Sequence, residues 1–249
     1  MISYKSEREL NLMRKACKIT AQILEEMCQM AKPGISTGEI DRYAEGRIRD
    51  LGALPAFKGY HGFPSSVCIS VNDEVVHGIP SNKRILKAGD IVGLDFGVVF
   101  EGWYGDSART VAVGPISKDA QKLLDVARES LMRGIEQCKE GNRVFDIGHA
   151  VQNYVEGFGY GVVKEFVGHG IGRALHEEPQ VPNYGPKGKG IPLKVGMVLA
   201  IEPMINAGSH EVKVLKDGWT AVTVDHSLSA HFEHTVAITP QGPEVLTVL

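Results

Sequence analysis

Two segments of this chain occur twice, and this repeat restricts the fold more than any other feature of the sequence. Lys87–Asp95 aligns without a gap on Lys194–Glu202, and at the same offset Lys32–Ile40 aligns on Lys139–Ile147. One offset shared by two separated blocks indicates an internal duplication. In each half an apolar strand ends in a carboxylate. We expect the two strands to meet about a pseudo-twofold axis, where their acids converge.

Four amphipathic helices are expected, two in each half. Ser6 with Glu9, and Ser36 with Glu39, match the capping-box pattern that starts a helix. Apolar residues then recur at helical spacing in each segment. The helices are expected over about residues 6–32, 36–51, 117–135 and 146–156.

Seven segments with a strand-like pattern lie between or after these helices. They are Ser66–Val71, Ile91–Phe100, Trp103–Val113, Val162–Val167, Met197–Ile201, Thr220–Val224 and His231–Ile238. Helix pairs followed by sets of strands predict an α+β fold, with an antiparallel or mixed sheet and helices on one side, rather than regular β-α-β alternation. We expect a single domain over residues 1–249, made of two duplicated halves at about 1–114 and 115–249.

Composition excludes several classes of protein. A formal net charge of -3 gives no electrostatic reason to expect nucleic acid binding, and no apolar run is long enough to span a bilayer. The four cysteines form no Cys-x-x-Cys pair, so we expect free thiols in a reducing cytoplasm. The first residues are charged and lack the apolar core of a signal peptide. The sequence therefore predicts a cytoplasmic protein that does not bind membranes.

A hairpin with two acids is the first candidate site. Residues 91–113 are expected to turn at Glu101-Gly102, a pair that suits a tight turn. A two-residue loop puts Asp106 opposite Gly97, with Asp95 as its diagonal neighbour on the same face. The two Cα atoms are then roughly 7–8 Å apart, within reach of a shared ion. A four-residue loop keeps this parity, whereas an odd loop would break it.

Two glutamates are candidates for the same site. Strand alternation puts His231, Glu233 and Thr235 on one face. Glu202 ends an apolar strand, and its position in the duplication matches that of Asp95. Four acids that converge require a cation, because like charges this close could not all stay ionised otherwise.

Histidines complete the set of candidate ligands. His169 and His176 lie in the glycine-rich segment Val167–His176, where glycine permits close backbone approach. His77, which precedes a glycine, is a third candidate. The glycine spacing matches neither a P-loop nor a dinucleotide fingerprint, so phosphate binding is the weaker interpretation.

Carboxylates with one or two imidazoles suit Mn, Fe, Co or Zn rather than a sulfur-selective ion. Two such ions with bridging carboxylates polarise a carbonyl and lower the pKa of bound water from about 15.7 towards roughly 7, which is hydrolase chemistry. A nucleophilic pair of Cys68 with a histidine is the competing enzyme class. That pair explains neither the four acids nor the repeat.

Together these segments resemble the type I methionine aminopeptidases of the bacterial kind. The resemblance covers essentially the whole chain and is carried by Tyr60–Pro64, Val71–Gly78, Leu94–Gly97, Tyr104–Ser107, Gly168–Gly172, Ala200–Met204 and His231–Thr235. It implies the pseudo-twofold pita-bread fold in a single catalytic domain. It also implies that the enzyme removes the initiator methionine from new polypeptides whose second residue is small.

By this resemblance, two divalent metal ions (Co, Mn, Fe or Zn) are held by five ligands, which are Asp95, Asp106, His169, Glu202 and Glu233. Asp106 and Glu233 are implied to bridge both ions. Glu202 is implied to accept a proton from the attacking water, while His77 and His176 contact the scissile amide and help to stabilise the tetrahedral intermediate.

The resemblance also implies a substrate pocket and partners. Tyr60, Phe63, Cys68 and Trp219 are implied to form an apolar methionine pocket, where aromatic faces attract the soft thioether sulfur. The implied partners are the N-termini of nascent polypeptides, close to the ribosome and without nucleic acid specificity. A monomer is expected.

Three positions depart from the commonest family pattern. Leu175 stands where many relatives have an aromatic residue, and His231 stands where glutamine or alanine is frequent. His226 occupies a turn position where glycine is usual. We expect these departures to affect substrate selectivity and loop shape, not the metal ligands.

Two alternative functions remain open. X-Pro aminopeptidases and prolidases resemble this chain, but they carry an additional N-terminal domain, for which a chain whose first helix starts at Ser6 has no room. A pita-bread peptide-binding scaffold without activity is the non-enzyme alternative. All five ligand positions bear acids or histidine, which favours the enzyme.

Overall fold

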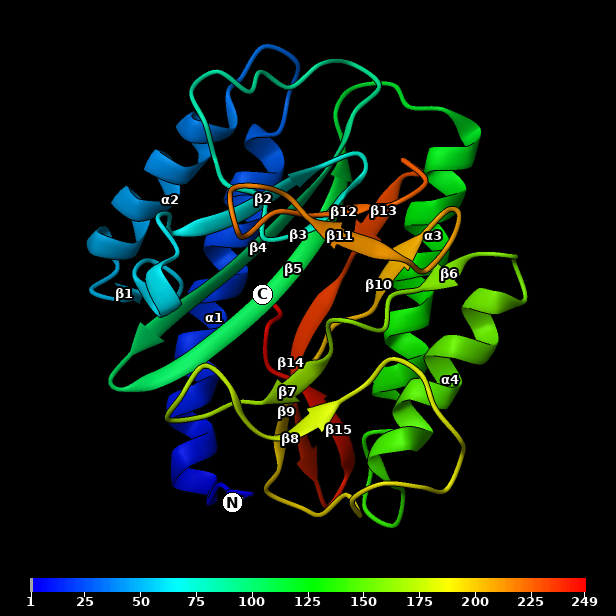
Figure 1. Cartoon of the computed structure of the whole chain (residues 1–249). Helices are drawn as coiled ribbons and strands as arrows, with labels where there is room; N and C mark the ends of the chain where they lie inside the picture. The colour runs from blue at the N-terminus through cyan, green and yellow to red at the C-terminus, as the bar shows by residue number, and fades with distance from the viewer. Residues whose placement is uncertain (1) are drawn as a thin grey trace.

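Helices cover one face of a large antiparallel sheet in the computed structural model, which describes residues 2–249 (Figure 1). The α-helices within that range are α1 (Glu7–Met30), α2 (Thr37–Asp50), α3 (Lys118–Ile135) and α4 (Val144–Glu156), and a single 3₁₀ turn spans Tyr60–Gly62. All four predicted helices are therefore confirmed, with shifts of one or two residues at their ends.

The starts of α1 and α2 are fixed by the predicted capping boxes. The backbone N–H of Ser6 donates to the carboxylate of Glu9 at 2.9 Å, and that of Ser36 donates to Glu39 at 2.9 Å. Each box satisfies N–H groups that have no partner in the first helical turn. The apolar face of α1 is buried as its spacing predicts, with Met13 fully enclosed against the sheet.

The main sheet runs in the order β1-β4-β5-β14-β9-β7-β8, with β2 added beside β4 and β15 beside β14. Its strands are β1 (Leu54–Pro55), β2 (Val67–Val71), β4 (Ile91–Phe100), β5 (Trp103–Ala112), β7 (Gly168–Gly170), β8 (Glu177–Val181), β9 (Val198–Ile201), β14 (Glu233–Thr239) and β15 (Gly242–Val245). All of its pairs are antiparallel. This agrees with the predicted α+β class.

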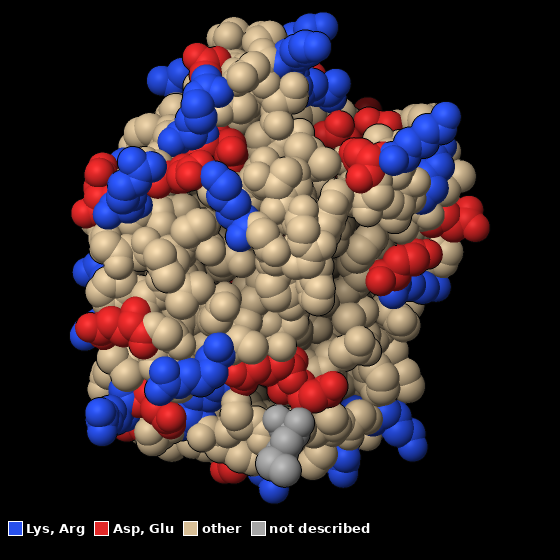
Figure 2. Space-filling view, turned by 60° about the vertical axis from the view of Figure 1, so that its left-hand side comes forward, with Lys and Arg blue, Asp and Glu red and all other residues tan. Residues whose placement is uncertain are grey.

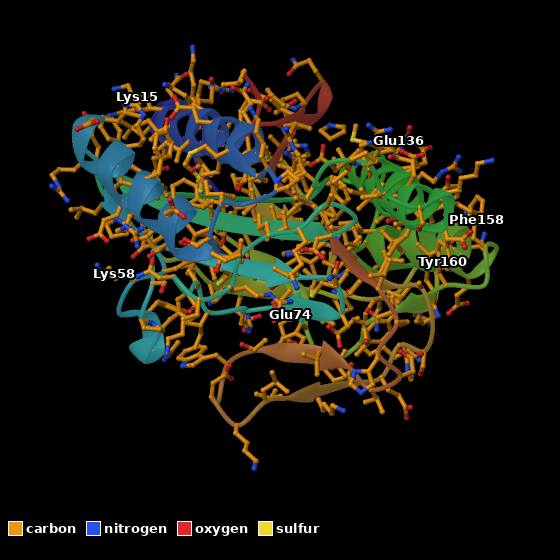
Figure 3. All side chains as sticks on the ribbon, turned by 90° about the horizontal axis from the view of Figure 1, so that it is seen from above. Lys15, Lys58, Glu74, Glu136, Phe158 and Tyr160 are labelled. Carbon is orange, nitrogen blue, oxygen red and sulfur yellow. The ribbon has the colours of Figure 1, made fainter. Side chains whose placement is uncertain are left out.

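Two smaller sheets lie beside the main one. One is formed by β13 (Ser229–His231), β10 (Met204–Asn206) and β6 (Gly161–Val162), and the other by β11 (Val212–Val214), β12 (Ala221–Thr223) and β3 (Glu74–Val76). Viewed from above, the β11–β12 hairpin lies on the side of the main sheet opposite the helices, and Glu74 of β3 lies near it (Figure 3). The hairpin therefore borders the face of the sheet that the helices leave open.

The central hairpin β4–β5 has the predicted register. Phe100 pairs with Trp103, and Gly97 pairs with Asp106. The turn residues Glu101 and Gly102 both have positive φ, at 51° and 77°, as a two-residue hairpin of the type I′ class requires. The two acids of this hairpin therefore share a face.

Helix α1 packs closely on β5 because Gly105 has no side chain. A Cβ at this position would lie 2.8 Å from the backbone N of Cys17 and 2.9 Å from Oγ1 of Thr20. We expect Gly105→Ala to reduce the free energy of unfolding by about 1–3 kcal/mol through overpacking. Gly46→Ala is the matched control, since nothing lies within 4 Å of its Cβ in α2, and it should stabilise by about 0.5–1 kcal/mol. Urea unfolding of both variants tests this prediction. Equal free energies of unfolding for Gly105→Ala and Gly46→Ala would contradict it.

Some predicted strands are wrong in extent. The segment Val162–Val167 is a strand only at its first residue, within β6, because the chain then leaves the sheet at the exposed Lys164 and Glu165. The predicted strand His231–Ile238 is interrupted at Phe232, whose N–H donates to the carbonyl of Pro203 at 3.4 Å. Short strands such as β8, β10, β11 and β15 carry too little alternation to be predicted.

Within residues 2–249, no helix is long and apolar enough to cross a membrane. The face in Figure 2 shows basic and acidic side chains interspersed around a broad uncharged region. That face has no extended patch of a single sign, in keeping with the small formal net charge of -3.

Candidate active site

Five candidate ligands come from five consecutive positions in the main sheet. In the order β4-β5-β14-β9-β7, Asp95 lies on β4, Asp106 on β5 and Glu233 on β14. Glu202 directly follows the last residue of β9, and His169 is the middle residue of β7. Strands far apart in sequence thus bring their acids and an imidazole to one region of the sheet.

Asp106, His169 and Glu233 form the tightest group. One ligand atom from each lies within 4.8 Å of the others, and the three residues are buried. Asp95 and Glu202 line the same pocket as His169. The structure therefore brings together all five residues that the sequence singled out as metal ligands.

Two of the buried carboxylate oxygens in this group are unsatisfied. Neither Oδ1 of Asp106 nor Oε1 of Glu233 has a hydrogen-bond partner among residues 2–249. An unpartnered polar atom in a protein interior is costly unless an ion or another group satisfies it. Hydrogen bonds fix the backbone at both residues. Thr235 Oγ1 donates to the carbonyl of Asp106 at 2.7 Å, and Ser107 Oγ donates to the carbonyl of Glu233 at 2.7 Å.

The acids of the site repel one another and are removed from water. Burial raises the pKa of Asp106 to about 7. Burial, and then the neighbouring acids, raise the pKa values of Asp95, Glu202 and Glu233 well above their usual range. A divalent cation would reverse this effect, because an opposite charge favours the ionised carboxylates. The donor set of oxygens with one imidazole fits such an ion.

The tautomer of His169 points to the same conclusion. Its Nδ1 lies 2.9 Å from the carbonyl oxygen of Gly170, so Nδ1 carries the proton and Nε2 presents a lone pair. That Nε2 lies 3.4 Å from Oε1 of Glu202. When the carboxylate is ionised, two electron-pair donors face each other with no proton between them. A cation between them would bind both the lone pair of His169 Nε2 and the carboxylate oxygen of Glu202.

A pocket of about 230 Å³ opens above these ligands. It is lined by Phe57, Tyr60, His61, Phe63, Cys68, His77, Asp95, His169, Leu175, His176, Glu202 and Trp219. The rings of Phe63 and Trp219 meet edge to face, with centroids 5.2 Å apart. All four residues predicted for the methionine pocket, and both predicted catalytic histidines, lie in its wall.

His77 is held in an unusual backbone conformation. Its φ is 59°, in the left-handed region that non-glycine residues rarely adopt. The following Gly78 packs so closely that a Cβ would clash with the carbonyl of Ile69. Burial lowers the pKa of His77 to about 4, so its imidazole is neutral near pH 7 and keeps one N–H to donate.

His176 is oriented by a tyrosine. The hydroxyl of Tyr60 lies 2.7 Å from Nδ1 of His176, and the imidazole ring meets that of His169 edge to face at 4.2 Å. Burial lowers the pKa of His176. Two neutral imidazoles, His77 and His176, therefore line the space above the candidate metal site.

Cys68 is a wall residue rather than a nucleophile. Burial and the nearby acids, Asp95 first among them, raise the pKa of its thiol well above the usual range. A thiol in such surroundings stays protonated and unreactive. The raised pKa of the thiol therefore argues against the competing interpretation of a nucleophilic Cys68–histidine pair.

Sequence reasoning missed three residues of the site. Phe57 and His61 line the pocket, and the side-chain amide of Asn183 donates to the carbonyl of Glu202 at 3.0 Å. His61 directly follows Tyr60 in a segment that was already singled out, so the segment itself was the signal. Asn183 lies in a loop with no pattern that marks it.

An oxygen-rich cluster at the base of an apolar pocket is an arrangement that suits a metal-dependent hydrolase. The chain belongs to metallopeptidase family M24, whose sequence profile matches residues 11–240. Methionine aminopeptidase 1 of Bacillus subtilis is 56% identical over 247 residues, which are 99% of each chain. The crystal structure of methionine aminopeptidase from Thermotoga maritima is 46% identical, with a TM-score of 0.98 and complete coverage of both chains.

A prolidase from Pyrococcus furiosus is similar to this chain in fold only. It is 24% identical, with a TM-score of 0.79, and this chain covers 65% of it. The likeness to both proteins confirms the predicted pita-bread fold.

The structure shows the surroundings of two positions, His226 and Leu175, that differ from the commonest family pattern. His226 adopts a φ of 60°, which explains why glycine suits this turn position. Leu175 is buried in the pocket wall, where an aromatic side chain would fill more space.

Proposed function

We propose that this chain is a metal-dependent methionyl aminopeptidase, which releases N-terminal methionine from polypeptides whose second residue is small. The observation that carries the proposal is the gathering of five candidate ligands at the base of an apolar pocket. The relatives named methionine aminopeptidase support it, because their similarity extends over the whole chain.

In this proposal Asp95, Asp106, His169, Glu202 and Glu233 hold two divalent ions, of Co, Mn, Fe or Zn. Asp106 and Glu233, each with a buried carboxylate oxygen that has no partner among residues 2–249, would be the ligands shared by both ions. Bound divalent ions supply Lewis-acid polarisation of the scissile carbonyl and a lower pKa for water.

The protein's own groups then move protons and position the substrate. Glu202 accepts a proton, because its carboxylate borders the pocket where the scissile bond would lie. His77 and His176 donate N–H groups to the scissile amide and to the negative charge that develops on its oxygen. Their lowered pKa values keep both imidazoles neutral. Each N–H therefore acts as a hydrogen-bond donor and keeps its proton on the ring.

The pocket selects the substrate side chain. Tyr60, Phe63, Cys68 and Trp219 form part of the wall of the pocket of about 230 Å³, and their aromatic rings and thiol suit contact with an unbranched thioether. Leu175 leaves one side of this wall aliphatic. We therefore propose methionine as the first residue.

Several broader assignments belong to the same proposal. The catalytic domain comprises two duplicated halves at about 1–114 and 115–249, each contributing two helices and part of the sheet. The enzyme acts as a monomer on the N-termini of nascent polypeptides in the cytoplasm, close to the ribosome.

A peptide assay tests the proposed function. Metal-stripped protein is titrated separately with Co, Mn, Fe and Zn, and hydrolysis of Met-Ala-Ser is compared with that of Leu-Ala-Ser and X-Pro peptides. We expect metal-dependent release of methionine alone, since only this side chain matches the pocket. Release from X-Pro peptides would favour a prolidase-type enzyme instead, and no turnover with any metal would favour a peptide-binding scaffold.

A further inference from the structure

His231 carries a buried polar atom that the proposed mechanism does not use. The side chain is 3% exposed, and its Nε2 has no hydrogen-bond partner in the described part of the chain. This atom lies 3.9 Å from Oε2 of Glu202. Buried imidazole nitrogens normally have partners, so this geometry requires an explanation.

The backbone directs His231 towards Glu202. The hydroxyl of Thr110 accepts from the N–H of His231 at 2.9 Å and donates to its carbonyl at 2.9 Å. On its other side β13 pairs with β10, which places His231 opposite Met204. Glu202 lies two residues before Met204, so the pairing of these short strands brings the imidazole beside the carboxylate.

Each oxygen of the Glu202 carboxylate faces a different imidazole. Nε2 of His169 faces Oε1 at 3.4 Å, while Nε2 of His231 faces Oε2 at 3.9 Å. The tautomer of His231 with a proton on Nε2 is favoured in this position, because a bare lone pair would face the carboxylate oxygen. His231 then points an N–H at Oε2 across 3.9 Å, a gap longer than a hydrogen bond, and leaves Oε1 for the metal site.

We propose that His231 is a positioning residue that holds the carboxylate of Glu202 through Oε2 and so orients Oε1 towards the metal ligands. The proposal rests on the proposed metal site. His231 is not part of the tight ligand group of Asp106, His169 and Glu233, which is consistent with an action through Glu202 rather than directly on an ion. Partners of metal ligands in such positions typically contribute 10–100-fold to metal affinity or activity.

Calorimetric titration of the metal-stripped protein with Mn²⁺ tests this role without any peptide turnover. The His231→Leu variant removes the N–H donor and puts an apolar side chain of similar size in its place. We expect it to weaken Mn²⁺ binding by about 10–100-fold. His231→Gln should restore most of the affinity, because its amide can again donate to Oε2. The Met-Ala-Ser assay should show the loss in kcat rather than in KM, since His231 does not line the substrate pocket.

Two further variants separate positioning from a general structural effect. His231→Asn has an amide one carbon shorter than that of glutamine, so it should bind Mn²⁺ as weakly as His231→Leu. In a Glu202→Gln background, His231→Leu should cause little further loss of affinity, because the carboxylate that His231 holds is already absent. His234→Gln is the control, since His234 bonds to Thr247 at 2.8 Å and lies outside the pocket lining.

The outcomes decide between the two roles. Equal Mn²⁺ affinity for the wild type and His231→Leu would overturn the proposal, as would equal losses for His231→Gln and His231→Asn. If His231→Leu does not fold, the comparison of His231→Gln with His231→Asn still decides. Should Mn²⁺ binding follow the expected pattern while no peptide is cleaved, the proposed peptidase function fails and the role of His231 stands.

Discussion

Glu202→Gln should lower kcat for Met-Ala-Ser by about 10³-fold or more while the protein stays folded. General acid–base catalysis alone contributes about 10²–10⁴-fold, and the substitution also removes one charged ligand from the metal site. Glutamine has nearly the same shape, so the packing around β9 is preserved. Without metal, the variant should unfold at the same temperature as the wild type or higher, because a buried charge among acids is gone.

Steady-state kinetics at saturating metal, with circular dichroism to follow thermal unfolding, measure both effects. Glu244→Gln is the matched control: it changes a glutamate that pairs with Arg14 at 2.7 Å, outside the pocket lining, and should leave kcat unchanged. A Glu202→Gln protein that binds metal and retains wild-type kcat would contradict the proposed proton transfer by Glu202.

The hairpin shows how much of the site could be predicted from sequence. Strand alternation and a two-residue turn were enough to place Asp95 and Asp106 on one face, and the observed register agrees. Capping boxes similarly gave the starts of α1 and α2. These features depend on residues close together in the chain, so their patterns are visible without the fold.

The remaining geometry depends on pairings that no local pattern reveals. His169 meets Glu202 only because β7 pairs with β9, which in turn pairs with β14. The duplication indicated that Asp95 and Glu202 are related, but not which strands lie between them. The break at Phe232 was hidden by the continuous alternation of 231–238, and the position of His231 beside Glu202 follows from the pairing of β13 with β10.

Asp106→Asn is expected to have opposite effects on activity and on the stability of the metal-free protein. Activity should be lost, because Asp106 is a proposed bridging ligand and an amide binds divalent ions more weakly than a carboxylate. At pH 7 the metal-free variant should nevertheless be more stable than the wild type, by about 2–4 kcal/mol. The substitution removes a buried charge that only a cation would compensate.

The pH dependence follows from the raised pKa of Asp106. In the unfolded chain an aspartate has a pKa of about 3.9, whereas burial raises that of Asp106 in the folded protein to about 7. Between these values the native state binds more protons than the unfolded state, so the free energy of unfolding falls as pH rises. Asparagine does not titrate. The advantage of the variant should therefore be small near pH 4, grow towards pH 7 and then level off.

Urea unfolding of both metal-stripped proteins between pH 4 and 8 measures this difference. Buried histidines such as His77 and His169, whose pKa values are lowered to about 4 and about 3, also make stability depend on pH. Their contributions are common to both proteins and largely cancel in the comparison. Added Mn²⁺ should reverse the order, because ligand at about 1,000 times its Kd stabilises the native state by about 4.1 kcal/mol, and only the wild type binds it tightly. A variant less stable than the wild type at pH 7 without metal would mean that partners within the protein hold the Asp106 carboxylate, and the electrostatic case for a cation there would fail.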